Sequence, residues 1–154
     1  MKIIFLDVDG VLNNCEYDKV AKSFKIHPDK IQRLNSLLRE TDAHIVLSSS
    51  WRYFVHNGSM NLHGLEWLFR THGLEVGRLV DITPPDKEGE TRGETISRWI
   101  KNHRSDRYIH MESYVVIDDM REEEFKEHVG LFIRTNPPVG LTDANCELIR
   151  KILA

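Results

Sequence analysis

The chain has 154 residues with 21 basic and 24 acidic side chains and a net charge of −3, so we expect one domain over residues 1–154 with no overall attraction to nucleic acid or anionic membranes. The two cysteines, Cys15 and Cys146, are too few and too far apart for a zinc ribbon or a disulfide framework. No apolar run reaches the roughly 18 residues of a membrane span, and the N-terminal apolar stretch is too short for a signal peptide, so we expect a cytoplasmic protein without a membrane partner.

Strand-like and helix-like segments alternate along the chain. Continuous apolar runs indicate strands buried on both faces, and apolar residues at helical spacing indicate amphipathic helices. Trp67 and Trp99 lie in such helices, and we expect both in the core. The alternation predicts a doubly wound, Rossmann-like α/β fold with a mostly parallel sheet and helices on both faces. We expect strands at Lys2–Asp7, Ala43–Ser48, Arg78–Thr83 and Ser113–Asp118, and a short edge strand at Leu131–Arg134. Between and after them we expect helices at Pro28–Glu40, Leu62–His72 and Gly93–His103, and a last helix that is capped by Thr142 and ends at Leu153.

Three of the apolar strands end on polar residues suited to phosphate chemistry. In an open α/β sheet, ligands bind beyond the carboxyl ends of the parallel strands, so these side chains should converge on one place. Clustered carboxylates and hydroxyls suit a hard divalent cation and a phosphoryl group. The residues are Asp7 and Asp9 after IIFL, Ser48 and Ser49 after HIVL, and Asp118 and Asp119 after YVVI.

The first of these pairs suggests a division of chemical work. Asp7 and Asp9 are two residues apart, so in extended backbone their side chains point to the same side. One carboxylate can attack phosphorus while the other gives a proton to the leaving oxygen and later activates water. An ordinary turn or a calcium loop could also contain D-x-D-G, but apolar Val11 and Leu12 follow, and the later EF-hand ligand positions do not match.

The other two strand ends supply donors and metal ligands. A hydroxyl at Ser48 or Ser49 could bind phosphoryl oxygens, although serines often end strands for structural reasons alone. Two adjacent acids cannot both be buried without a cation, so we expect Asp118 to coordinate a metal and Asp119 to act through water or a hydrogen bond. The alternative is a pair of acids at a helix N-terminus.

A cation is also needed near the reacting phosphoryl group to offset its charge. The best candidate is Arg92, which stands in TRGETISRWI at the expected start of a helix. An ordinary solvated arginine is the alternative reading, and Lys87 is a competing candidate for the same role.

Taken in order, these motifs resemble those of the haloacid dehalogenase (HAD) superfamily of phosphohydrolases. The matches are DVDGVLN, a strand ending in serine, a basic residue opening a helix, and VVIDD. The segments DVDGVLN, SSSWR and RGETISRWI are also similar to the capless HAD domains of RNA-repair proteins. This chain departs from the common pattern in having Arg92 where the superfamily usually has lysine, and serine rather than threonine in the second motif.

The resemblance implies an enzyme, a phosphoric monoester hydrolase of the HAD type, with Mg²⁺ as cofactor. It makes Asp7 the nucleophile and Asp9 the general acid/base. It assigns Mg²⁺ to Asp7, Asp118 and the backbone carbonyl of Asp9, and the phosphoryl oxygens to Ser49 or Ser48.

The length of the inserts bears on the substrate. Residues 13–42 and 92–114, where HAD enzymes for small metabolites usually carry a cap, are too short to bury a core of their own. An open site favours a phosphate at the end of a large substrate, such as the 3′-phosphate of a nucleic acid. Trp51 and Arg52 could line its rim by stacking on a base and pairing with phosphate, although Trp51 could equally serve packing.

Two other functions are compatible with parts of the pattern. One is a phosphatase of the same superfamily for nucleotides or other small metabolites. The other is a phosphoacceptor signalling module of the response-regulator type, but such receivers carry their acidic pair after the first strand and a lysine late in the chain. Here D-x-D comes first and the adjacent acids come late, so the order disfavours a receiver.

Overall fold

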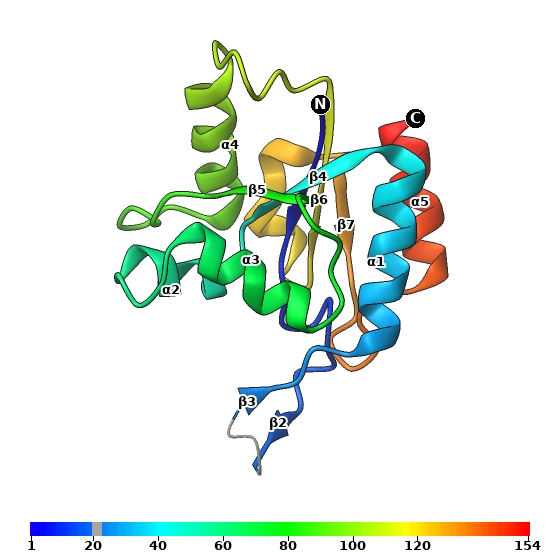
Figure 1. Cartoon of the computed structure of the whole chain (residues 1–154). Helices are drawn as coiled ribbons and strands as arrows, with labels where there is room; N and C mark the ends of the chain where they lie inside the picture. Colours follow the sequence, from blue (N-terminus) through cyan, green and yellow to red (C-terminus); the bar gives the residue numbers. More distant parts are fainter. Residues whose placement is uncertain (20–22) are drawn as a thin grey trace.

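The computed structural model describes residues 1–19 and 23–154, and its centre is a five-stranded parallel sheet (Figure 1). The strand order is β5-β4-β1-β6-β7. From β1 the chain adds β4 and β5 on one side and then β6 and β7 on the other, so the strand order reverses beside β1. Open α/β sheets bind their ligands at such a reversal. The strands are β1 (Lys2–Leu6), β4 (Ala43–Leu47), β5 (Leu79–Ile82), β6 (Ser113–Asp118) and β7 (Phe132–Arg134).

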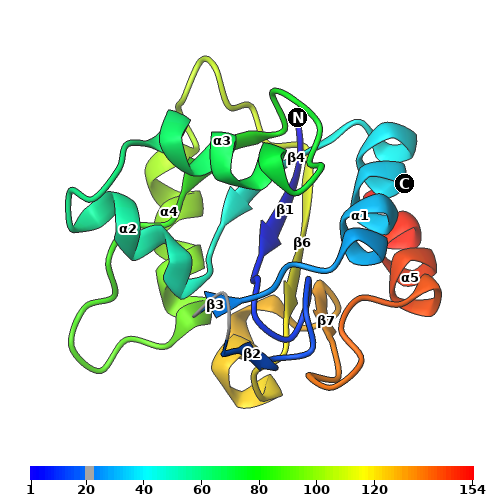
Figure 2. The ribbon, with the colours of Figure 1, turned by 60° about the horizontal axis from the view of Figure 1, so that its bottom comes forward.

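Helices cover both faces of this sheet, as the alternating sequence pattern predicts (Figures 1 and 2). The helices α1 (Pro28–Thr41), α3 (Leu62–Thr71) and α5 (Asp143–Leu153) pack on one face. The helix α4 (Arg92–His103) and the 3₁₀ segment η2 (Glu122–His128) pack on the other, which we call the α4 face. Consecutive strand side chains alternate between these faces, so Phe5 is buried on the α4 face and Leu6 on the α1 face.

The ends of the helices follow local chemistry. Thr91 and Thr142 cap α4 and α5, each through a capping box with the residue three positions on. Gly73 has a φ of +101° directly after α3, a left-handed conformation that ends the helix at little steric cost. The predicted fold class and the predicted cap at Thr142 are confirmed.

One predicted core residue lies at the surface. Trp67 is 64 % exposed, so its predicted place in the core is wrong. It is two residues from both Leu65 and Phe69, which are buried, and two residues turn a helix by about 200°.

Five short elements were not predicted. Four of them are too short to produce a hydrophobic period: the hairpin strands β2 (Tyr17–Asp18) and β3 (Ser23–Phe24), the 3₁₀ turn η1 (Ser50–Arg52) and the helix α2 (Tyr53–His56). The fifth is η2, whose helical backbone is interrupted at Phe125.

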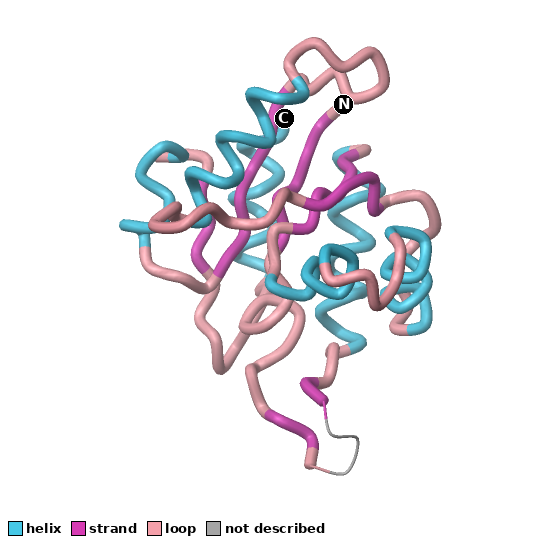
Figure 3. Tube along the Cα trace, turned by 90° about the vertical axis from the view of Figure 1, so that its left-hand side faces the viewer, coloured by secondary structure: helices cyan, strands magenta, loops and turns pink. Residues whose placement is uncertain are grey.

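The carboxyl ends of the strands carry little cover. Figure 3 shows the β2–β3 hairpin projecting beyond this edge of the sheet, which we call the carboxyl edge. Within residues 1–19 and 23–154 the hairpin is the only insertion between β1 and α1, and it is far smaller than a cap domain. The predicted capless fold is confirmed. None of the helices in the described part of the chain is long and apolar enough to cross a membrane.

Candidate active site

Three predicted site residues meet at the carboxyl edge because the central strands are in register. Leu6 of β1 pairs with Leu47 of β4 and with Ile117 of β6. The next residue of each strand, Asp7, Ser48 and Asp118, therefore lies beside the others. Backbone hydrogen bonds fix this alignment, from Asp7 N to the carbonyl of Ile117 at 3.0 Å and from Ser48 N to the carbonyl of Leu6 at 3.0 Å.

The same alternation sets the direction of these side chains. Phe5, Val46 and Val116 are buried on the α4 face. Asp7, Ser48 and Asp118 each come two positions later, so they point to that face as well. The helix α4 covers this face (Figure 2). It begins at Arg92, whose guanidinium lies beside the carboxylates of Asp7 and Asp118.

Arg92 bridges the two buried acids. Its Nη1 donates to Asp118 Oδ2 at 2.6 Å and lies 3.2 Å from Asp7 Oδ1. Asp118 is fully buried and Asp7 is 5 % exposed. Lys87, the competing candidate, is exposed in the loop before α4. The structure thus places Arg92, and not Lys87, against the carboxylates.

The cluster holds more negative than positive charge in a dry environment. Burial, followed by the charge of Asp118, raises the pKa of Asp7 well above its ordinary value, although Arg92 partly opposes this rise. Burial also raises the pKa of Asp118 against the opposing influence of Arg92. For Arg92 burial alone lowers the pKa, but the charges of Asp118 and Asp7 outweigh it and raise the pKa overall. One guanidinium is therefore shared by two carboxylates.

A divalent cation fits this arrangement of oxygen atoms. Carboxylate oxygens of Asp7, Asp118 and Asp119 lie within 4.8 Å of one another. Oxygen donors that carry excess negative charge are the ligands that Mg²⁺ and Ca²⁺ prefer. Asp119 was predicted to act mainly through water or a hydrogen bond, and its carboxylate is also close enough to join the other two as a ligand. A side chain at Gly10, which has a φ of +81°, would place Cβ 2.3 Å from Asp119 Oδ2, so this approach needs glycine.

The two candidate serines have different surroundings. The Oγ of Ser48 is buried and has no hydrogen-bond partner among the described residues. The Oγ of Ser49 accepts a hydrogen bond from Trp51 N at 3.2 Å and caps η1. A buried hydroxyl without a partner is unfavourable unless a ligand supplies one. Ser48 is thus the serine with a free hydroxyl on the side of Asp7.

Asp9 does not join the three clustered carboxylates. Its Oδ2 accepts a hydrogen bond from Trp51 Nε1 at 3.0 Å, and its Oδ1 accepts one from Asn13 Nδ2 at 2.9 Å. Among the residues that the structure describes, its carboxylate is not part of the possible metal site. Asn13 stands inside DVDGVLN, but its contact with Asp9 was not predicted.

A family comparison agrees with this geometry. A family model described as the HAD domain in Swiss Army Knife RNA repair proteins matches residues 3–146. The chain belongs to this HAD family. The match runs from β1 into α5 and includes every residue of the candidate site. No curated protein matches the chain.

One predicted rim residue of this HAD domain lies elsewhere. Arg52 is 1 % exposed, so its predicted place at an open rim is wrong. The 3₁₀ turn η1 directs the side chain inward, where Nη1 donates to the carbonyls of Ser48 and Ser49 at 2.9 Å and Nη2 donates to Asp86 at 2.8 Å. Arg52 supports the backbone below the serines.

Trp51 of the HAD domain has two kinds of neighbour. Its ring packs against Phe69 at 5.8 Å and Phe54 at 6.3 Å between centroids, in line with the packing alternative. The side chain stays partly exposed, and its indole nitrogen reaches Asp9. Packing therefore accounts for one side of the ring only.

Proposed function

We propose that this HAD domain is a Mg²⁺-dependent phosphomonoesterase that works through an aspartyl-phosphate on Asp7. The observation that carries the proposal is the pair of buried carboxylates, Asp7 and Asp118, which share one guanidinium beside the unpartnered hydroxyl of Ser48. Among the described residues, such a site lacks a second cation and an acceptor for the hydroxyl of Ser48. A divalent metal supplies the first, and a phosphoryl group supplies the second.

Each side chain has a definite role in this reaction. A carboxylate oxygen of Asp7 attacks phosphorus, the bond from phosphorus to the leaving oxygen breaks, and Asp9 gives that oxygen a proton. Asp9 then takes a proton from water as the water attacks the phosphoryl group, which frees phosphate and restores Asp7. The hydroxyl of Ser48 donates to a phosphoryl oxygen, while Arg92 orients Asp7 and Asp118 and adds positive charge.

The metal would be held by Asp7, Asp118 and the backbone carbonyl of Asp9, with Asp119 near enough to contribute. When bound there, Mg²⁺ supplies positive charge that offsets the charge of the phosphoryl group.

The open carboxyl edge supports a large substrate. The described chain covers it with a two-strand hairpin instead of a cap, so a phosphate at the end of a polymer can reach Asp7 without a closing domain. The matched family is described as belonging to RNA repair proteins. We therefore propose a nucleic-acid end, and a 3′-phosphate in particular, as the substrate.

A phosphate-release assay tests both parts of the proposal. Oligonucleotides with 3′- or 5′-phosphates, mononucleotides and sugar phosphates are compared with and without Mg²⁺, and Asp7→Asn serves as the blank. We expect Mg²⁺-dependent release that is fastest with 3′-phosphorylated oligonucleotides. Faster turnover of mononucleotides would overturn the substrate, and full activity in the blank would overturn the mechanism.

A further inference from the structure

Two side chains, Trp51 and Asn13, donate hydrogen bonds to the carboxylate of Asp9. We propose that Trp51 is a positioning residue that orients Asp9 toward the leaving oxygen of the substrate. This inference rests on the proposed function, because it gives Asp9 the work of proton transfer. It assigns to Trp51 a part in the reaction that packing alone does not explain.

The hydrogen bonds to Asp9 have only one possible direction. The indole Nε1 of Trp51 and the amide Nδ2 of Asn13 are donors that cannot accept a proton. They hold Asp9 Oδ2 and Oδ1 at 3.0 and 2.9 Å. Neither group can take a proton from Asp9, so a proton on this carboxyl remains available for transfer to the substrate. The two hydrogen bonds thus orient the carboxyl group of Asp9 without competing for its proton.

The side chains of Asn13 and Trp51 are themselves held in place. Asn13 is fully buried, and its Oδ1 accepts hydrogen bonds from Gly10 N at 2.9 Å and Cys15 N at 3.0 Å. Because the carbonyl oxygen of the amide is taken by backbone donors, Nδ2 must face Asp9. Asn13 therefore sets one side of the carboxylate from within the loop that follows β1.

Trp51 sets the other side from a different strand end. The Oγ of Ser49 accepts a hydrogen bond from the backbone of Trp51, and Phe69 supports the ring. The segment that starts at the free hydroxyl of Ser48 thus continues directly to the side chain that holds Asp9. A phosphoryl group bound by Ser48 and the acid that serves its leaving oxygen are then placed by one rigid turn.

Replacing the indole with a benzene ring tests this role. Trp51→Phe removes the N–H donor and keeps an aromatic ring against Phe69. The matched control is Trp99→Phe, because Trp99 Nε1 also donates to a carboxylate, that of Asp81, at 2.8 Å, and its ring is buried in the core on the α4 face. Both variants are assayed below their unfolding temperatures.

The kinetic readout compares two leaving groups. The 4-nitrophenolate of 4-nitrophenyl phosphate departs without a proton, whereas the alkoxide of glycerol phosphate needs one. The kcat/KM of each substrate reports on formation of the aspartyl-phosphate, the step in which the leaving group departs, whereas kcat also includes the hydrolysis that both substrates share. General acids contribute about 10²–10⁴-fold, so we expect Trp51→Phe to lower kcat/KM for glycerol phosphate by about tenfold more than for 4-nitrophenyl phosphate. Trp99→Phe should change kcat/KM of both substrates equally. An equal loss of kcat/KM on both substrates in Trp51→Phe would overturn the positioning role.

A second readout is independent of activity. The chain has three tryptophans, and Trp51→Phe identifies the indole N–H resonance of Trp51 in a ¹⁵N–¹H spectrum. Asp9→Asn should move this resonance and leave that of Trp99 in place; an unmoved resonance would overturn the contact. If Asp9→Asn moves the resonance but the wild-type protein releases no phosphate from any substrate, the contact is real and the proposed function is overturned, and with it the part of Trp51 in the reaction.

Discussion

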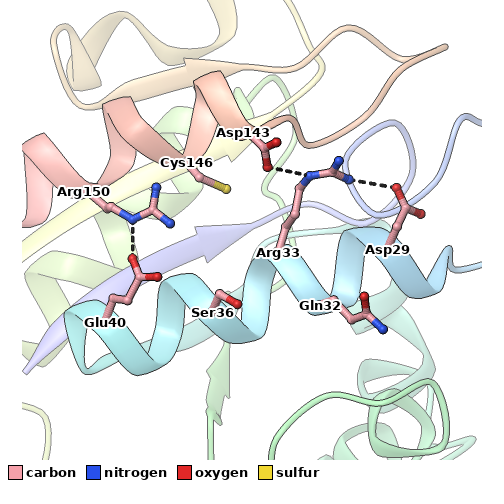
Figure 4. A pocket seen from close by; sticks show the side chains of 8 residues that line it. All are labelled: Asp29, Gln32, Arg33, Ser36, Glu40, Asp143, Cys146 and Arg150. Carbon is pink, nitrogen blue, oxygen red and sulfur yellow. Dashed lines mark hydrogen bonds and ion pairs between the residues drawn. The ribbon is translucent and has the colours of Figure 1, made fainter.

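Two of the carboxylate–arginine clusters in the described part of this domain differ in burial and in charge balance. One is the candidate active site, where Asp7 and Asp118 share Arg92 below the surface. The other lines a surface groove of about 440 Å³ between α1 and α5 (Figure 4). The residues of this α1–α5 groove are Asp29, Gln32, Arg33, Ser36, Glu40, Asp143, Cys146 and Arg150.

The charges of the α1–α5 groove are matched with one another. Arg33 donates to Asp29 at 2.8 Å and to Asp143 at 2.9 Å, and Arg150 pairs with Glu40 (Figure 4). Water reaches these side chains, so each pair contributes little and forms without a ligand. The pattern is that of two helices joined by surface ion pairs.

The difference between the two clusters shows that a ligand-binding site is indicated by buried polar groups without partners. The α1–α5 groove is an open hollow, but its acids Asp29, Asp143 and Glu40 already have cations. At the carboxyl edge two buried acids share Arg92 and have no second cation among the described residues, and the buried hydroxyl of Ser48 has no acceptor there. Buried polar groups without partners are unfavourable in a free protein, so they point to a ligand more strongly than an open hollow does.

The largest expected effect separates the two clusters by activity. Asp7→Asn removes the attacking carboxylate with almost no change of shape, so we expect kcat for phosphate release to fall by about four orders of magnitude or more. The matched change in the α1–α5 groove, Glu40→Gln, should leave kcat within about twofold. Both are measured with 4-nitrophenyl phosphate and Mg²⁺. A comparable loss in the two variants would remove the functional distinction between the clusters.

Arg92 gives a smaller effect of the same kind. Arg92→Lys keeps the charge but loses the planar fork that reaches both Asp118 and Asp7. Removal of one electrostatic donor typically lowers kcat by about 10²–10³-fold, and we expect a fall near the lower limit because lysine retains the charge. The same change at Arg150 is the control. Normal turnover by Arg92→Lys would show that the cation of the cluster is not needed.

A stability measurement sharpens the contrast further. Burial, then the charge of Asp118, raises the pKa of Asp7 above its ordinary value of 3.8. A carboxyl with a raised folded pKa contributes stability below its unfolded pKa, and this is lost as the pH rises through the folded pKa. At pH 7 the metal-free protein should therefore gain about 1 kcal/mol from Asp7→Asn, seen as a rise in Tm of about 2–4 °C. Thermal unfolding in EDTA measures it.

The pH and the metal provide the controls for this experiment. Near pH 3 Asp7 carries a proton in both states, so the advantage of the variant should vanish. Adding Mg²⁺ should reverse the order at pH 7, because a ligand at 100 times its Kd stabilises the wild type by about 2.7 kcal/mol. A lower Tm for Asp7→Asn in EDTA at pH 7 would contradict the view that the acids are underpaired.

Much of the candidate active site could be predicted from the sequence, because the ends of parallel strands bring its residues together. The apolar runs before Asp7, Ser48 and Asp118 are continuous, and parallel strands bring their carboxyl ends to one edge. The position of Arg92 followed from the start of its helix. Two choices remained open, that between Ser48 and Ser49 and that between Arg92 and Lys87, because both depend on the face of the sheet on which α4 packs.

The remaining contacts were hidden because they have no local pattern. Trp51 and Asp9 are 42 residues apart, and only the turn η1 brings the indole to the carboxylate. Arg52 was misplaced for the same reason, since that turn carries its side chain inward. Asn13 stood inside a recognised motif, but an asparagine in a loop does not reveal which carboxylate it will contact.

The smallest expected effect concerns the α1–α5 groove. Glu40→Gln removes one partner of Arg150 on an exposed helix pair, so the free energy of unfolding should fall by less than about 1 kcal/mol. Salt screens such pairs, so the difference from the wild type should shrink further when the ionic strength rises from about 0.01 to 1 M. Urea unfolding at both salt concentrations measures this, with Ser36→Ala in the same groove as an uncharged control. A loss of several kcal/mol that resists salt would mean that the α1–α5 groove, like the site around Asp7, depends on desolvated charge, and the distinction between the two clusters would no longer hold.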